Sequence, residues 1–170
     1  MKIRTIALTT ALFACTATAA FAQDFSDKDK SFLKDSTQDN MAEVKMAELA
    51  IKTTKNPKIR SFAQKMVTDH NALIAGSKPV AAKAGVEPPK TDGFEANADY
   101  LKLKILTGET FDKSYVKTMV SDHHSDLDKI KQENAATTNA DMKKLTTHAA
   151  TVVAGHTKMI DTLAGSMGLQ

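Results

Sequence analysis

Cysteine, tryptophan and long apolar runs are nearly absent from this sequence, and each absence excludes a class of protein. Cys15 is the only cysteine, and tryptophan does not occur among the 170 residues. Because Cys15 lies in a segment that we expect to be removed, disulfide bonds, thiolate metal sites and thiol nucleophiles are excluded from the mature chain. The sequence also lacks a glycine-rich phosphate loop, a Gly-x-Ser-x-Gly motif and a His-Glu-x-x-His motif, which argues against nucleotide-binding, hydrolase and zinc-protease functions.

An excess of charge of one sign is missing as well. The formal net charge is +3, and it falls to +1 when Lys2 and Arg4 are removed with the N-terminal segment. No basic run remains of the kind that nucleic-acid binding requires, so we expect no nucleic-acid partner. No stretch after that segment is continuously apolar, so the processed chain is not expected to be an integral membrane protein.

The N-terminal segment resembles a cleavable export signal. Lys2 and Arg4 precede an apolar run of small residues, and Ala20-Phe21-Ala22 supplies a small-x-small cleavage site. Lipoprotein processing at Cys15 is the alternative, which the phenylalanine two positions before it disfavours. The predicted organisation is a signal peptide over residues 1–22 and one domain over residues 23–170, located in the periplasm or secreted.

The domain shows helical spacing of apolar residues throughout and no run of strand alternation. Start and stop signals predict helices over residues 27–54, 57–85, 94–106, 109–136 and 141–166, with a kink near Pro79. The turns after the first and fourth of these helices are short, so each of the two pairs forms an antiparallel hairpin. Two hairpins joined by a long crossover that contains a short helix predict an all-α, ferritin-like antiparallel four-helix bundle.

The most specific feature of the sequence is an internal repeat. Residues 62–70 (Phe-Ala-Gln-Lys-Met-Val-Thr-Asp-His) recur as residues 115–123 (Tyr-Val-Lys-Thr-Met-Val-Ser-Asp-His). Both copies follow the pattern of an aromatic residue and then Met-Val-x-Asp-His, and they fall in the second and fourth predicted helices. We therefore expect the repeated residues to meet in the core of the bundle.

Three of the five histidines lie in the middle of an apolar helix face, one on each of three helices: His70, His123 and His156. His124 and His148 lie nearer the edges of their faces. Glu43 flanks the apolar face of the first helix, and Asp112 shares the face of His123. The charged run from Asp126 to Lys131 is interpreted as a solvated helix surface.

Imidazoles and carboxylates without thiolates favour Zn, Fe, Mn or Cu(II) as a bound metal. The predicted ligands are Glu43, His70, Asp112, His123 and His156, with Asp69 and Asp122 behind them as residues that orient imidazoles. Met66, Met119 and Met159 would favour Cu(I) if their sulfur atoms also faced the cavity; at helical spacing, methionine is more often core filling.

A metal-free network of Asp-His hydrogen bonds is the alternative, because buried polar groups can satisfy one another. Neither half of the chain has the Glu-x-x-His spacing of di-iron carboxylate bundles. The height of the side chains along the bundle distinguishes the hypotheses. Side chains at one level favour a metal site, and side chains spread along the axis favour the network.

The chain resembles the bacterial exported family called domain of unknown function 4142. The resemblance is carried by the segments 43–50, 56–57, 62–70 and 108–123 and by the late His156. It implies a ferritin-like bundle in the periplasm or cell envelope, with motif positions at Glu43, Asp69, His70, Asp112, Asp122, His123 and His156. The family name brings no activity, and the Asp-His pairs in place of Glu-x-x-His argue against di-iron oxidase or iron-storage chemistry.

The sequence thus favours a periplasmic bundle that binds or buffers a metal ion over one that catalyses turnover. The competing hypothesis is a metal-free structural, stress-related or interaction protein of the cell envelope, in which the polar cluster fixes helix register. An oxidoreductase is a third and weaker hypothesis. A homo-oligomer or an envelope protein partner fits either of the first two.

Overall fold

A computed structural model describes residues 24–91 and 94–169 of the chain, so the predicted signal peptide lies outside the described residues. The described part is helical without strands: α1 (Asp27–Thr53), α2 (Pro57–Ala84), α3 (Phe94–Lys104), α4 (Gly108–Ala136) and α5 (Ala140–Ser166). The prediction of an all-α chain is confirmed, and the helix ends differ from the predicted ones by at most two residues. The helix α2 continues through Pro79.

Local side chains fix where the long helices begin and end. Ser26 and Asp29 form a capping box, in which each side chain accepts a hydrogen bond from the other residue's backbone N–H. Asn56 and Asn139 accept the first free N–H groups of α2 and α5. Gly85 ends α2 with a φ of +68°, a conformation that costs other residues energy. The side-chain caps at Ser26, Asn56 and Asn139 are each worth about 1 kcal/mol of stability.

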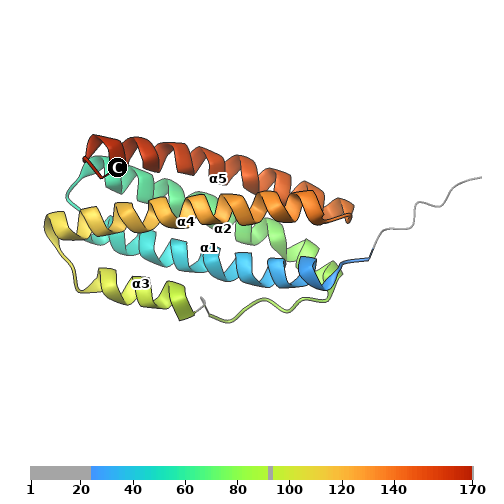
Figure 1. Cartoon of the computed structure of the whole chain (residues 1–170). Coiled ribbons are helices and arrows are strands. Elements are labelled where there is room, and N and C mark those ends of the chain that lie inside the picture. The colour runs from blue at the N-terminus through green and yellow to red at the C-terminus, as the bar shows by residue number, and fades with distance from the viewer. Residues whose placement is uncertain (1–23, 92–93, 170) are drawn as a thin grey trace, which may run out of the picture.

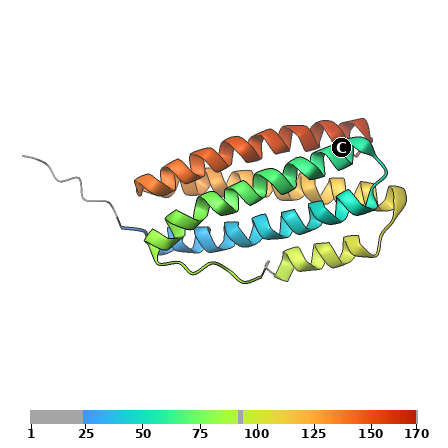
Figure 2. The ribbon, with the colours of Figure 1, turned by 180° about the vertical axis from the view of Figure 1, so that it is seen from behind.

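The four long helices form two antiparallel hairpins that lie side by side (Figures 1 and 2). The helix α1 packs along α2, α4 packs along α5, and α2 joins the two hairpins through its contacts with α5. The long connection that contains α3 returns the chain along the bundle, with α3 against α1. As a result α2 and α4 run in the same direction, and the two copies of the repeat lie on parallel helices.

The few aromatic residues supply much of the core near the end of the bundle where α2 and α4 begin. Phe62, Phe111 and Tyr115 are buried at 3% exposure or less. The rings of Phe111 and Tyr115 stack at 6.0 Å between centroids, and Phe62 meets Tyr115 edge-on at 6.5 Å. Aliphatic side chains and methionines from all five helices fill the space around these rings, among them Met46, Ala50, Met66, Leu103, Met119 and Ile160.

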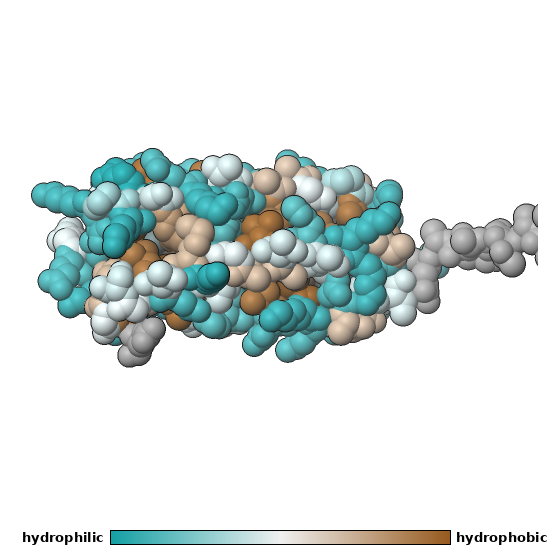
Figure 3. All heavy atoms as spheres, turned by 90° about the horizontal axis from the view of Figure 1, so that it is seen from above, coloured by the Kyte–Doolittle hydropathy of each residue, from teal (hydrophilic) through white to brown (hydrophobic). Residues whose placement is uncertain are grey.

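The outer face over α5 is mostly hydrophilic, with small apolar patches near the middle (Figure 3). Within residues 24–91 and 94–169, no helix is both long and apolar enough to span a bilayer.

Candidate metal centre

Three histidines converge in the interior from three different helices. His70 lies on α2, His123 on α4 and His156 on α5, and their exposed fractions are 2%, 0% and 1%. One ring nitrogen from each lies within 4.8 Å of the other two. The ring centroids form a nearly equilateral triangle with sides of 5.1, 5.6 and 5.7 Å. The three imidazoles thus stand at one level of the bundle.

The direction and spacing of the repeat explain why two of these rings meet. His70 and His123 each end a copy of the Met-Val-x-Asp-His segment, and the two copies lie on helices that run parallel. In each copy a fully buried methionine stands four residues before the histidine. Residues four apart share a face of an α-helix, so each histidine points inward with its methionine. His156 completes the group from α5, whose direction is opposite to that of α4.

On His70, the nitrogen that faces away from the other two rings has two acceptors on α1. Its Nδ1 lies 2.7 Å from the side-chain oxygen of Asn40 and 2.8 Å from Oε2 of Glu43. Glu43 is itself buried, with 3% of its surface exposed. Its second oxygen, Oε1, lies 3.3 Å from Nδ1 of His123 and has no hydrogen-bond partner. Glu43 therefore links the two histidines of the repeat.

The outward nitrogens of the other two rings are anchored in the same way. Nδ1 of His123 donates to the carbonyl oxygen of Met119 at 2.9 Å. Nε2 of His156 donates to Oδ2 of Asp69 at 2.7 Å. Histidines that bind metals usually donate their second N–H to a carboxylate or a backbone carbonyl, which fixes both tautomer and ring orientation. All three imidazoles here have such an acceptor.

These anchors leave a nitrogen lone pair of each ring directed at the others. Nε2 of His70 and Nδ1 of His156 are 3.3 Å apart, and Nε2 of His123 is buried without any hydrogen-bond partner. A neutral imidazole carries one proton, and here that proton is engaged on the outer nitrogen. A cation shared between these lone pairs would stabilise the arrangement: a metal ion or, for the closest pair, an additional proton.

The spacing fits one transition-metal ion. An ion bonded at about 2.0–2.1 Å to three imidazole nitrogens holds the nitrogens about 3.3 Å apart and the ring centroids roughly 5.2–5.5 Å apart. The closest nitrogen pair and the three centroid distances already match these values to within a few tenths of an ångström. Binding would draw the three nitrogens, which lie within 4.8 Å of one another, to about 3.3 Å.

The charges of the cluster suit a cation. Burial alone would raise the pKa of Glu43, but the charges of His70 and His123 and the hydrogen bond from His70 lower it to about 2. Burial lowers the pKa of His156 to about 4, despite its hydrogen bond with Asp69, and burial also lowers the pKa of His123. For His70, burial is outweighed by Glu43, which raises its pKa. An ionised carboxylate on Glu43 thus stands beside His70 and His123, and the lowered pKa values of His123 and His156 favour the neutral rings that bind metal.

Of the predicted ligands, the structure brings Glu43, His70, His123 and His156 together and leaves Asp112 elsewhere. Asp112 is eleven residues before His123 on α4, about 16 Å at the rise of an α-helix. It lines a separate pocket with Thr53 and Asn56, and its Oδ1 is buried without a partner.

The two aspartates of the repeat differ as well. Asp69 binds His156, whereas none of the three histidines lies within hydrogen-bonding distance of the half-buried Asp122. Burial, with repulsion from Glu43 and Asp126, raises the pKa of Asp122 to about 7. Met159 is 39% exposed, so its sulfur does not join the buried group.

Two groups of the site were missed by sequence reasoning. Asn40 is a polar residue one turn before Glu43 on α1, and that spacing is a signal that could have identified it. The carbonyl of Met119 carries no signal, because every helical residue has one.

The model of a family described as a domain of unknown function, DUF4142, matches residues 14–163. No curated protein matches the sequence. Among solved structures, a fragment of a DUF305 protein from Deinococcus radiodurans has a TM-score of 0.75 at 12% identity, over 85% of this chain and 99% of that one. The structure of CopM in its Cu(I)-bound form has a TM-score of 0.68 at 18% identity, over 82% of this chain and 96% of that one. At these identities the likeness concerns the fold.

Proposed function

We propose that this chain, which belongs to the family described as a domain of unknown function, DUF4142, binds one transition-metal ion through His70, His123 and His156. The observation that carries the proposal is that each imidazole is anchored through its outer nitrogen while its inner nitrogen faces the other two rings. Glu43, which lies beside the outer nitrogens of His70 and His123, would balance the charge of the ion from behind these two rings. The role that fits best is binding or buffering of the ion.

Copper and zinc are the first candidates. Imidazole nitrogens suit both metals, and for a given set of such ligands Cu(II) binds more tightly than the other divalent first-row ions. The Cu(I)-bound state of CopM, a protein of similar fold, supports copper. Manganese prefers more oxygen ligands than this buried group offers, and Fe(II) binds a given set of such ligands more weakly than Cu(II) does.

Architecture and sequence also support a ferritin-like assignment and an export address. Two hairpins joined by a long crossover have the connectivity of ferritin-like bundles. A single ion is proposed because neither half carries the Glu-x-x-His pair of di-iron centres. The signal-like segment over residues 1–22 supports the periplasm, or the outside of the cell, as the place of action.

Metal content tests the proposal directly. Protein purified without chelator should contain close to one ion per chain, or should take up one equivalent of Cu(II) or Zn(II) in a calorimetric titration. Because the ion binds the folded state, free metal at about a thousand times the Kd should stabilise the protein by about 4 kcal/mol. A protein that is metal-free and that ignores added Cu(I), Cu(II), Zn(II), Fe(II) and Mn(II) would contradict the proposal and favour the metal-free network in the cell envelope.

Replacement of Asp69 with asparagine should weaken metal binding about 10- to 100-fold. An asparagine can no longer fix the tautomer and orientation of His156 as the carboxylate does. The matched control is Asp161→Asn, because Asp161 holds the exposed His124 at 3.0 Å on the surface. Metal titration of the two variants should separate them, and equal affinity in both would show that the Asp69 contact does not act on the ion.

A further inference from the structure

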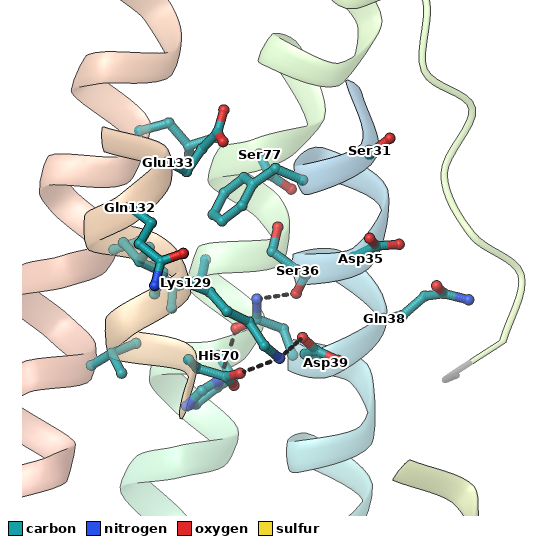
Figure 4. A pocket seen from close by; sticks show the side chains of 18 of the residues that line it. Ser31, Asp35, Ser36, Gln38, Asp39, His70, Ser77, Lys129, Gln132 and Glu133 are labelled. Atoms are coloured by element: carbon teal, nitrogen blue, oxygen red, sulfur yellow. Dashed lines mark hydrogen bonds and ion pairs between the residues drawn. The ribbon is translucent and has the colours of Figure 1, made fainter. Parts of the chain in front are cut away.

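A groove runs between α1 and α4 and reaches one of the three clustered histidines, His70. Its volume is about 680 Å³, and its lining includes Phe32 and Asn40 from α1, Leu73 from α2, Ile130 from α4 and Val153 from α5. The lining also includes Glu43 and His70, and Figure 4 shows His70 at the inner end of the groove. Among neighbouring long helices, α1 and α4 pack together least. The groove is therefore an opening from solvent to the residues directly behind the candidate ion.

One side chain ties the two walls of the groove together near that inner end. Nζ of Lys129 on α4 lies 3.0 Å from Asp126 on the same helix and 3.3 Å from Asp39 on α1, as Figure 4 shows for Asp39. The lysine side chain is 56% exposed. Its ammonium group can leave the carboxylates for solvent without any movement of the helices.

The inner end of the groove is acidic. The carboxylates of Asp39 and Asp126 both pair with the ammonium of Lys129, and Glu43 also lines the groove. Burial and the nearby Glu43 and Asp39 raise the pKa of Asp126 to about 6, while Lys129 opposes the shift. Such a concentration of negative charge attracts free cations and repels anionic metal complexes. Oε1 of Glu43, which has no hydrogen-bond partner, can receive a cation without losing a hydrogen bond.

On the side of His156, the cluster is closed by two hydrogen bonds to Asp69. Oδ2 of Asp69 accepts hydrogen bonds from both Nε2 of His156 and Nζ of Lys65, each at 2.7 Å. An ion that approached from this side would have to break the contact that orients His156.

We propose that a free metal cation enters the centre through the α1–α4 groove, where it displaces the Lys129 ammonium from Asp39 and Asp126 and then passes Glu43 to the three histidines. The inference rests on the proposed metal binding and adds the route, the gate and the form of metal that is taken up. Lys129 is the gate because its ammonium group occupies the position between Asp39 and Asp126 that an entering cation would have to occupy.

The test is the rate at which metal-free protein takes up Co²⁺, followed by stopped-flow absorption of its visible bands. Lys129→Met should raise the association rate constant at least fivefold and leave the stoichiometry at one, since the gate is removed and the acidic groups remain. An Asp39→Asn/Asp126→Asn double variant should lower the rate constant at least fivefold. Lys131→Met is the matched control, because it removes the same charge from an exposed position two residues along α4, and it should stay within twofold of the parent.

The other outcomes are separable. If Lys65→Met accelerates uptake and Lys129→Met does not, the ion enters beside Asp69 and the inference is wrong. If the parent binds Co²⁺ at a rate that none of these variants changes, the groove route fails while the metal site stands. If the parent binds no Co²⁺ and none of the other metals, the proposed function and this inference fall together.

Discussion

Replacing His123 with alanine is expected to weaken binding of the ion about a hundredfold or more. Structural zinc sites with four ligands are worth roughly 10–16 kcal/mol, or about 2.5–4 kcal/mol for each ligand. The loss of one imidazole should therefore raise the Kd by a factor of roughly 60 to 700. Competition titration against a chelator of known affinity measures a change of this size.

The control for this variant is the adjacent residue. His124→Ala removes the same side chain one position along α4, from a ring that is 56% exposed and pairs with Asp161, and it should leave the Kd unchanged. Circular dichroism should show the same helical content in both variants. Equal Kd values for the two would mean that His123 is not a ligand, whatever metal the protein contains.

Replacing Phe62 with alanine should destabilise the protein by about 3–5 kcal/mol, the usual loss for a large buried ring. Phe62 is 3% exposed, and its ring lies 6.1 Å from that of His123 and 6.5 Å from that of His156. For a domain of this length, the midpoint of thermal unfolding should fall by roughly 10 °C or more. The Phe62 ring also packs near two proposed ligands, His123 and His156, so the affinity for metal should fall as well.

Leu101→Ala provides the comparison for the stability measurement. Leu101 lies on α3 and is 55% exposed, so its loss should change the free energy of unfolding by less than about 0.5 kcal/mol. Chemical denaturation of the metal-free forms gives both values without a contribution from the ion. A loss below 1 kcal/mol for Phe62→Ala would contradict its place in the core.

Helix boundaries could be predicted because the signals for them are local. Ser26, Asn56 and Asn139 act on backbone groups two or three residues away, and the sequence contains both partners of each contact. The inward direction of the three histidines followed from helical periodicity for the same reason. Periodicity gives the direction of a side chain from its helix axis and needs no other helix.

Height along the bundle was not predictable in the same way. Asp112 and His123 share a face of α4, yet they stand about three turns apart, and only the packing of α4 against its neighbours decides which of them meets His70. The charged run from Asp126 to Lys131 was interpreted as a solvated surface. In the structure, Asp126 and Lys129 face Asp39 across the groove, a contact between helices that periodicity along α4 cannot reveal.

The three histidines do not belong to one hairpin: His70 comes from the α1–α2 pair, and His123 and His156 come from the α4–α5 pair. An ion held by all three would fasten the first hairpin to the second, at a point where the chain has no covalent link. It would close a loop of about fifty residues, and a covalent bond closing such a loop would stabilise a protein by about 4 kcal/mol. Residues 24–169 contain no cysteine, so the ion would serve there as a reversible cross-link in place of a disulfide bond, and its stabilising effect would follow the supply of metal.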